Sequence, residues 1–290
     1  PGADVTVMMD YLRGKANEAR QSPAQLNRYL RLHLNIRTKQ TTRWIPLESF
    51  DATGQLIDPT EWAGMKVHGG LDLSSNTDVS AFALVFPPQA EEDAYQVLCR
   101  FWIPEEAMVE RSRRDRVPYD AWVRDGLMSA TPGNVIDFTR IVADVRELGK
   151  RFKIAEVAFD RWGAVQVSQE LGGAGLTMVQ FGQGYVSMSP AMRELERLIL
   201  EHKLAHGNNP VLTWMANNLV VRTDPAGNIK PDKEKSIERI DGMVALVMAL
   251  DRALPQLAEN PDSLGQYGGE IDRVSEAQLM ALRNVLERRQ

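Results

Sequence analysis

Three consecutive β-like segments, the first of which alternates apolar and polar residues with a period of two, are the first strong pattern along the chain. The segments are residues 66–74, 80–86 and 95–102, separated by turn-prone residues 75–78 and by Pro87-Pro88. Period-two alternation is typical of β-strands, and short connections favour antiparallel neighbours. We therefore predict an antiparallel meander of three strands.

Helix-like and strand-like segments alternate after this meander. The predicted helices cover residues 137–152, 164–171, 190–204 and 236–254, and the predicted strands cover 154–160, 176–181, 211–214 and 219–223. Such alternation builds parallel strands with helices packed on the sheet. The expected fold class is α/β: a mixed sheet that combines the antiparallel meander with parallel βα units and carries helices on both faces. This arrangement suits a ribonuclease-H-like sheet.

The pattern changes on either side of this region. Residues 5–35 are rich in helix formers, whereas the segment that follows is interrupted by Pro46, Gly54 and Pro59. Beyond Pro255 a glycine-containing stretch precedes an amphipathic helical pattern, which we expect to contact another component. The predicted division is a helical linker and connector at 1–64, a main domain at 65–255, and a C-terminal linker with an amphipathic helix at 256–290.

Composition narrows the class of protein. With 290 residues and 43% hydrophobic content the chain is ordinary for a globular protein, and its longest apolar run, 243–250, is too short to cross a bilayer. We therefore expect no membrane association and an intracellular setting. Cys99 is the only cysteine, which excludes an intrachain disulfide and a cysteine-based zinc site within one chain.

The net charge of −5 argues against binding nucleic acid through bulk electrostatics. Residues 1–50 nevertheless hold eight Lys and Arg against four acids. Carboxylates that hold divalent cations can also meet DNA through those cations. The acidic balance therefore weakens a nucleic-acid function without excluding it.

Three aspartates lie at positions where a carboxylate is unfavourable unless it has a binding partner. Asp72 falls on the polar face of the first strand, Asp160 closes an apolar strand, and Asp241 borders the apolar stripe of the last predicted helix. Simple alternatives remain open: neighbouring serine hydroxyls for Asp72, a helix cap for Asp160 and an exposed ion pair for Asp241. If the fold brings the three together, they cannot all ionise without cations. Hard oxygen ligands select Mg²⁺ or Mn²⁺, and a pair of such ions suits phosphodiester hydrolysis.

These residues lie in segments that resemble a known family. The segment at 70–78, GLDLSSNTD, resembles the first nuclease motif of the terminase large subunits of tailed phages, especially the HK97-like group. FDRW at 159–162 resembles the second motif, and KPDK at 230–233 with RIDGMVAL at 239–246 resembles the third. Residues 22–35 are similar to the helix before the nuclease. The resemblance covers about residues 18–252.

The resemblance implies a metal-dependent DNA endonuclease of ribonuclease-H-like fold that cuts concatemeric phage DNA. It implies two divalent cations, Mg²⁺ or Mn²⁺, with Asp72, Asp160 and Asp241 as their ligands and catalytic residues. It also implies double-stranded DNA, a terminase ATPase domain, a small terminase subunit and a portal protein as partners, in the host cytoplasm at the procapsid portal vertex. The chain has no P-loop motif and begins Pro1-Gly2, which we interpret as one domain of a longer protein.

Other polar residues carry weaker hypotheses. Four basic residues are candidate DNA contacts, although a solvated loop is the simpler explanation for the lysines: Lys230, Lys233, Lys235 and Arg161. Asp78 and Asp232 suit turns or caps better than accessory metal ligands, and Asp137 suits a helix start. The basic run Arg111, Arg113, Arg114 and Arg116, with Tyr119 and Trp122 nearby, fits a DNA-contacting edge or an ordinary solvated helix. His202 and His206 fit surface histidines better than a zinc pair.

Three other classes of protein share parts of this pattern. A ribonuclease-H-like resolvase or transposase would show a preference for branched DNA. A sugar-kinase or actin-like ATP-binding protein would need two glycine-rich phosphate loops, whereas residues 159–162 offer bulky side chains. A docking module with structural carboxylates would bind no metal.

Overall fold

The structure is a computed structural model of the 290-residue chain. It describes residues 9–21, 29, 33–34, 44–74, 78–90, 92–160, 164–236 and 238–254. The predicted C-terminal amphipathic helix, most of the second N-terminal helix and Arg161 lie outside these residues. No helix in the described part is long and apolar enough to cross a membrane.

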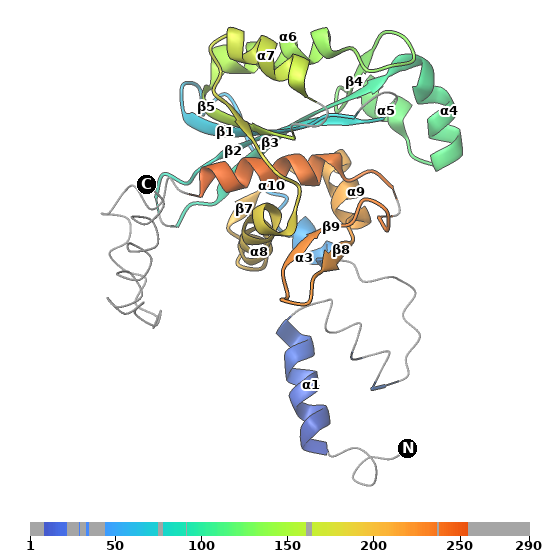
Figure 1. Cartoon of the computed structure of the whole chain (residues 1–290), viewed down its shortest axis with the longest axis vertical. Coiled ribbons are helices and arrows are strands. Elements are labelled where there is room, and N and C mark those ends of the chain that lie inside the picture. The colour runs from blue at the N-terminus through green and yellow to red at the C-terminus, as the bar shows by residue number, and fades with distance from the viewer. Residues whose placement is uncertain are drawn as a thin grey trace, which may run out of the picture.

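A mixed sheet forms the centre of the molecule (Figure 1). Its strands are β1 (Lys66–Asp72), β2 (Ser80–Phe86), β3 (Tyr95–Pro104), β4 (Ser129–Thr131), β5 (Lys153–Phe159), β6 (Met178–Gln180) and β7 (Leu204–Ala205). The order is β4-β3-β2-β1-β5-β6, with β7 paired to the start of β3. β2 runs antiparallel to β1 and β3, whereas the β1–β5, β5–β6 and β3–β4 pairs are parallel. The predicted meander with added parallel units is confirmed.

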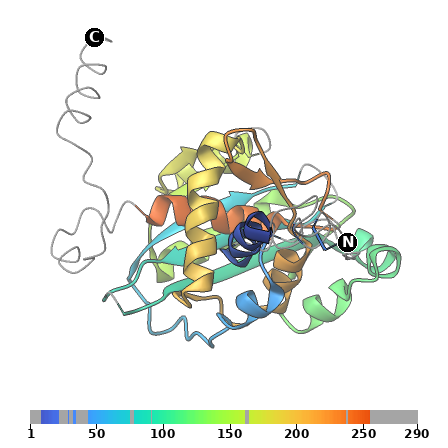
Figure 2. The same ribbon diagram turned by 90° about the horizontal axis from the view of Figure 1, so that it is seen from below.

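Helices cover both faces of this sheet, as predicted. The helices of the described part are α1 (Met9–Gln21), which stands away from the sheet in Figure 1, α3 (Leu47–Asp51), α4 (Glu105–Asp115), α5 (Tyr119–Arg124), α6 (Phe138–Arg151), α7 (Val165–Gly173), α8 (Tyr185–Leu200), α9 (Pro210–Asn218) and α10 (Asp241–Ala253). α6 and α7 lie on one face, and α10 lies on the other with α8 and α9 beyond it (Figure 1). Seen from below, α8 crosses α10 (Figure 2). A small hairpin, β8 (Val221–Thr223) with β9 (Ile229–Pro231), lies on the same side.

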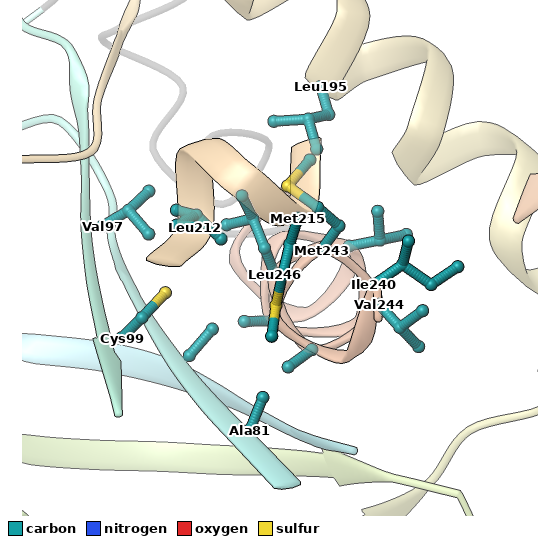
Figure 3. Close-up of a cluster of buried hydrophobic side chains, with 14 of the residues drawn as sticks. Ala81, Val97, Cys99, Leu195, Leu212, Met215, Ile240, Met243, Val244 and Leu246 are labelled. Atoms are coloured by element: carbon teal, nitrogen blue, oxygen red, sulfur yellow. The ribbon is translucent and has the colours of Figure 1, made fainter. Parts of the chain in front are cut away.

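α10 is buried nearly all round, because it lies between the sheet and two further helices. Its residues 242–250 are all buried. Figure 3 shows Met243 and Leu246 of α10 among Leu195 of α8, Met215 of α9 and Cys99 of β3. A helix that is apolar on every side belongs in a core. The packing therefore determines where the first residue of this helix lies.

Two glycines let α10 approach the sheet closely. A Cβ atom on Gly70 of β1 would lie 2.0 Å from the backbone oxygen of Ala245. A Cβ atom on Gly242 would lie 2.6 Å from the ring of Phe101 and 2.8 Å from Met215 Sδ. Strand and helix thus touch backbone to backbone, at a distance that no larger residue permits at these positions.

The predicted faces of β1 are correct, but the strand is not half-buried. Val67 and Leu71 join the core under α6 and α7, whereas Gly70 and Asp72 face α10. Every residue of β1 after Lys66 is buried. A strand covered by helices on both faces offers its polar residues no open surface. Asp72 is therefore accessible only at the end of the strand.

Three predicted elements need correction. The predicted strand at 211–214 is wrong, because the Asn209 side chain accepts hydrogen bonds from Val211 N and Leu212 N and starts α9 with Pro210 as its first residue. The helix predicted at 190–204 begins instead at Tyr185 and ends at Leu200, with Pro190 inside it. The last helix begins at Asp241 rather than 236, because the preceding residues form a separate turn.

Candidate active site

Two of the three predicted acids leave the sheet side by side. Asp72 is the last residue of β1, and Asp160 directly follows the last residue of β5. The two strands are parallel neighbours, with Leu71 opposite Phe159. The carboxyl ends of parallel strands are where open α/β sheets gather their functional groups. Asp72 is 2% exposed, whereas Asp160 is partly exposed.

Asp241 reaches the same edge from α10, which packs across β1. Its Oδ2 atom is buried and accepts no hydrogen bond from any residue in the described part of the chain. Burial, together with the negative charge of Asp72, raises the pKa of Asp241 to about 7, while Lys233 and Arg239 act in the opposite direction. The two carboxylates thus lie near each other, and a neighbouring cation reduces the repulsion between them.

That cation is Lys233, on the turn that follows β9. Its Nζ atom lies 3.0 Å from Asp72 Oδ2 and 3.3 Å from Asp72 Oδ1. Burial alone would lower the pKa of Lys233, but the charges of Asp72, Asp241 and Asp160 outweigh it, and the pKa is raised. All three predicted acids therefore act on one ammonium group.

The three acids do not form a closed triad. Among the residues that the structure describes, no three His, Cys, Asp or Glu side chains lie close enough to make a ready metal-binding group. The arrangement is instead a pair, Asp72 and Asp241, with Asp160 at the neighbouring strand end. The three acids thus lie at one edge of the sheet, and Asp160 stays outside the Asp72–Asp241 pair.

Gln183 is a site residue that the sequence reasoning missed. It lies three residues after β6, and its Nε2 donates to Asp72 Oδ1 at 3.0 Å. β6 is the parallel neighbour of β5, so its carboxyl end falls at the same edge of the sheet. Its position just after a parallel strand was the signal that could have identified Gln183. The residue is uncharged, so a search for carboxylates and basic residues passed over it.

A cavity of about 260 Å³ lies beside Asp72, because Gln183 and Lys233, which both bind Asp72, line it. It is lined by polar residues of the hairpin and the following turn together with the start of α8: Gln183, Met188, Arg222, Lys230, Pro231, Asp232, Lys233 and Glu234. Lys230 Nζ lies 5.2 Å above the ring of Tyr185, and Lys235 Nζ lies 4.0 Å from Asp232. The three lysines thus line or adjoin this cavity, and their contact with DNA stays a prediction.

The chain matches, over residues 1–256, the family model described as "Terminase large subunit, endonuclease domain". The chain belongs to this family. The terminase large subunit of Enterobacteria phage HK97 is 37% identical over 262 residues, which is 89% of this chain and 49% of that protein. Its crystal structure covers 87% of this chain and 52% of that one at 36% identity, with a TM-score of 0.67.

Protein YmfN of Escherichia coli K12 is 29% identical over 92% of this chain and 60% of its own length. The chain therefore spans about half the length of the curated relatives it matches. The family match, with the HK97 structure, confirms the resemblance of the motifs and the fold. It also decides against the recombination and ATP-binding alternatives, whereas metal binding is what distinguishes a nuclease from a docking module.

Some secondary hypotheses about this terminase nuclease domain were wrong. Arg111, Tyr119 and Trp122 are buried, so they are not part of a DNA-contacting edge, whereas Arg113, Arg114 and Arg116 are exposed, as expected of a solvated helix. His206 is buried rather than superficial, stacked on Phe50 at 4.2 Å between ring centroids, and burial lowers its pKa. Asp232 is buried and binds Arg222 at 3.0 Å, and its side chain also accepts from Lys235 N at 3.2 Å, which agrees with the predicted turn role. Asp137 caps α6 through Thr139 N, as predicted.

Proposed function

We propose that this chain is a two-metal-ion DNA endonuclease in which Asp72, Asp160 and Asp241 hold two divalent cations, Mg²⁺ or Mn²⁺. The observation that carries the proposal is the buried, unpartnered Oδ2 atom of Asp241 in the field of Asp72. A buried carboxylate oxygen without a donor is costly unless something cationic binds it. Membership of the terminase endonuclease family supports the same reaction.

The residues at the site fit hard divalent cations. Carboxylate oxygens are the ligands that Mg²⁺ and Mn²⁺ prefer, and the repulsion between the acids favours a dication over a monovalent one. Bound cations would activate the attacking water and stabilise the leaving oxygen of the phosphodiester. Gln183 orients the carboxylate of Asp72 through its hydrogen bond, and helices on both faces keep water from all but the strand ends.

Metal dependence tests this function directly. The chain should relax and then degrade supercoiled plasmid in Mg²⁺ or Mn²⁺ and lose this activity in excess EDTA, because carboxylates alone cannot activate the water. Restoring Mn²⁺ after EDTA treatment controls for irreversible unfolding. Unrelated plasmids should give no discrete fragments, since no base-reading helix is evident. Undiminished cleavage in EDTA would contradict the proposal.

Lys233 gives a second prediction, with opposite effects on metal and on DNA. Its ammonium contacts both oxygens of Asp72 and competes there with any cation. Lys233→Met should therefore tighten Mn²⁺ binding without DNA by about threefold or more. The same change should raise the KM for DNA, because a released Lys233 would bind backbone phosphate.

Isothermal titration with Mn²⁺ and plasmid nicking measure the two effects. Lys235→Met is the matched control for Mn²⁺ binding, since Lys235 lies on the same turn but faces Asp232 at 4.0 Å. Weaker Mn²⁺ binding in Lys233→Met would show that the lysine supports the site rather than competing for it.

We also propose the wider setting that the family suggests. The chain would act with a terminase ATPase domain, a small subunit and a portal protein, on double-stranded DNA at the procapsid portal vertex in the host cytoplasm. For the domain division, we propose that the nuclease unit extends further towards the N-terminus than residue 65. Trp44, Phe50 and Trp62 are buried in the two cores, which supports a start near residue 44. Lys230 and Arg161 remain proposed DNA contacts.

A further inference from the structure

A single carboxylate oxygen joins three segments that are far apart in the sequence. Asp78, between β1 and β2, forms two ion pairs through Oδ1, which lies 2.6 Å from Arg111 Nη1 and 2.7 Å from Arg239 Nη2. Arg111 belongs to α4, and its side chain is only 9% exposed. Arg239 lies two residues before Asp241. Asp78 therefore links the turn after β1 both to the edge helix and to the start of α10.

The backbone of Asp78 is fixed to the end of β1. Ser74 Oγ donates to the carbonyl oxygen of Asp78 at 2.7 Å, and Ser74 N donates to Ser80 Oγ at 3.1 Å. Ser74 lies two residues after Asp72. The carboxylate that binds Arg239 is therefore held in place relative to Asp72.

The start of α10 has few other polar anchors. Ile240, in the N-cap position, makes no side-chain cap. Asn218 Nδ2 donates to Arg239 O at 3.4 Å, and Gly242 N donates to Met215 Sδ at 3.1 Å. The amide contact is long, and sulfur is a weak acceptor. The Asp78–Arg239 ion pair is thus the charged contact that joins this helix end to the segment after β1 among the described residues.

We infer that Asp78 is a positioning residue that sets Asp241 of α10 against Asp72 of β1 through Arg239. The inference rests on the proposed function, because it assigns the restraint to metal binding. Two carboxylates repel each other, and a catalytic site needs its groups held within about 0.5 Å of the productive geometry. A tether between the two elements that carry them supplies that restraint without touching metal or DNA.

The first test measures hydrogen exchange at the start of α10 in the metal-free protein. In Asp78→Asn, backbone amides of residues 241–244 should exchange hydrogen at least about fivefold faster than in the wild type, as the start of α10 loosens. Asp78→Glu, which keeps the charge, should restore most of the protection. Val145→Ala, in the core under α6, is the control for general destabilisation. Equal exchange at 241–244 in Asp78→Asn and the wild type would overturn the inference.

The second test follows metal affinity. The Kd for Mn²⁺, measured by titration calorimetry well below the Tm of every variant, should rise about tenfold in Asp78→Asn and stay unchanged in Val145→Ala. If Asp78→Asn does not fold, Arg239→Gln tests the same contact and leaves the buried Arg111 paired with Asp78. Where both variants fold, the double variant should bind Mn²⁺ no more weakly than Asp78→Asn alone, because Asp78→Asn already removes the contact with Arg239.

The outcomes separate the inference from the function on which it rests. A wild-type chain that binds no Mn²⁺ would overturn the proposed function and the inference with it. Normal wild-type binding with an unchanged Kd in Asp78→Asn and Arg239→Gln would overturn the inference alone. So would an equal loss of affinity in Val145→Ala, which would show an effect of stability rather than of position.

Discussion

Replacing Asp241 with asparagine should lower DNA cleavage by about a hundredfold or more while raising the thermal stability of the metal-free protein. The loss follows because asparagine keeps the size of the side chain but removes the charge that would hold a cation. Mutation of a residue that only orients a metal ligand typically lowers metal affinity or activity by about 10–100-fold. Loss of a ligand itself should lower activity by at least as much. Plasmid nicking at saturating Mn²⁺ measures the loss.

The gain in stability depends on pH, and its sign follows from the raised pKa. The pKa of Asp241 is about 7 in the folded protein, against an ordinary value of 3.8, because the carboxylate is buried beside Asp72. Between these values the folded chain holds a proton that the unfolded chain has released, so wild-type stability falls as pH rises through this window. The Tm difference between Asp241→Asn and wild type should be near zero below pH 4 and largest above pH 7.

Thermal unfolding in EDTA between pH 4 and pH 8 measures this difference. Asp125→Asn is the control, since Asp125 pairs with Arg124 on the surface at 54% exposure and should change neither activity nor Tm appreciably. Near-wild-type nicking by Asp241→Asn would remove α10 from the active site. A Tm difference that does not vary with pH would show that the pKa of Asp241 is not raised in the folded protein.

Gly70→Ala should prevent stable folding or lower the Tm by roughly 10 °C or more. The added Cβ would lie 2.0 Å from Ala245 O and 2.7 Å from Ala249 N, both backbone atoms of a helix packed on all sides. Overpacking typically costs about 1–3 kcal/mol and more where neighbours cannot move, and each 1 kcal/mol lowers the Tm of a domain of this size by about 2–4 °C. Calorimetry or circular dichroism measures the change.

Gly149→Ala is the matched control for this substitution. Gly149 lies in α6 on the opposite face of the sheet, and the nearest atoms to its added Cβ would be 3.9–4.0 Å away. A glycine in a helix interior costs roughly 0.5–1 kcal/mol relative to alanine, so this variant should be neutral or more stable. An unchanged Tm in Gly70→Ala would mean that α10 does not rest on β1, and Asp241 would then lack its place beside Asp72.

Much of the fold follows from local patterns. β-like runs bounded by turn residues located β1, β2 and β3 to within two residues, and the cap at Asp137 gave the start of α6. The wrong strand prediction at 211–214 came from a conflict between two local patterns. The β-branched and aromatic residues of 211–214 outweighed the Asn209-Pro210 start signal, although a side-chain cap directs the backbone more strongly than strand preference does.

The start of α10 shows a different limit. Its apolar periodicity extends back to residue 236, so the pattern alone predicts a longer helix. The chain instead forms a turn in which Ser236 Oγ donates to Asp232 O at 2.8 Å, and Arg239 turns to Asp78. Contacts with distant residues thus decide where the helix begins. This placed Asp241 in the first turn rather than in mid-helix.

The sequence by itself determined the order of elements, the mixed sheet, the family motifs and the three aspartates as candidates, because each depends on neighbours within a few residues. Only the tertiary structure decided which side chains meet. The contact between Lys233 and Asp72 spans 161 residues, and the contact between Gln183 and Asp72 spans 111. Periodicity carries no information about such pairs. They arise from the order of parallel strands and from the backbone contact of Gly70 with α10, which together bring distant segments to one edge.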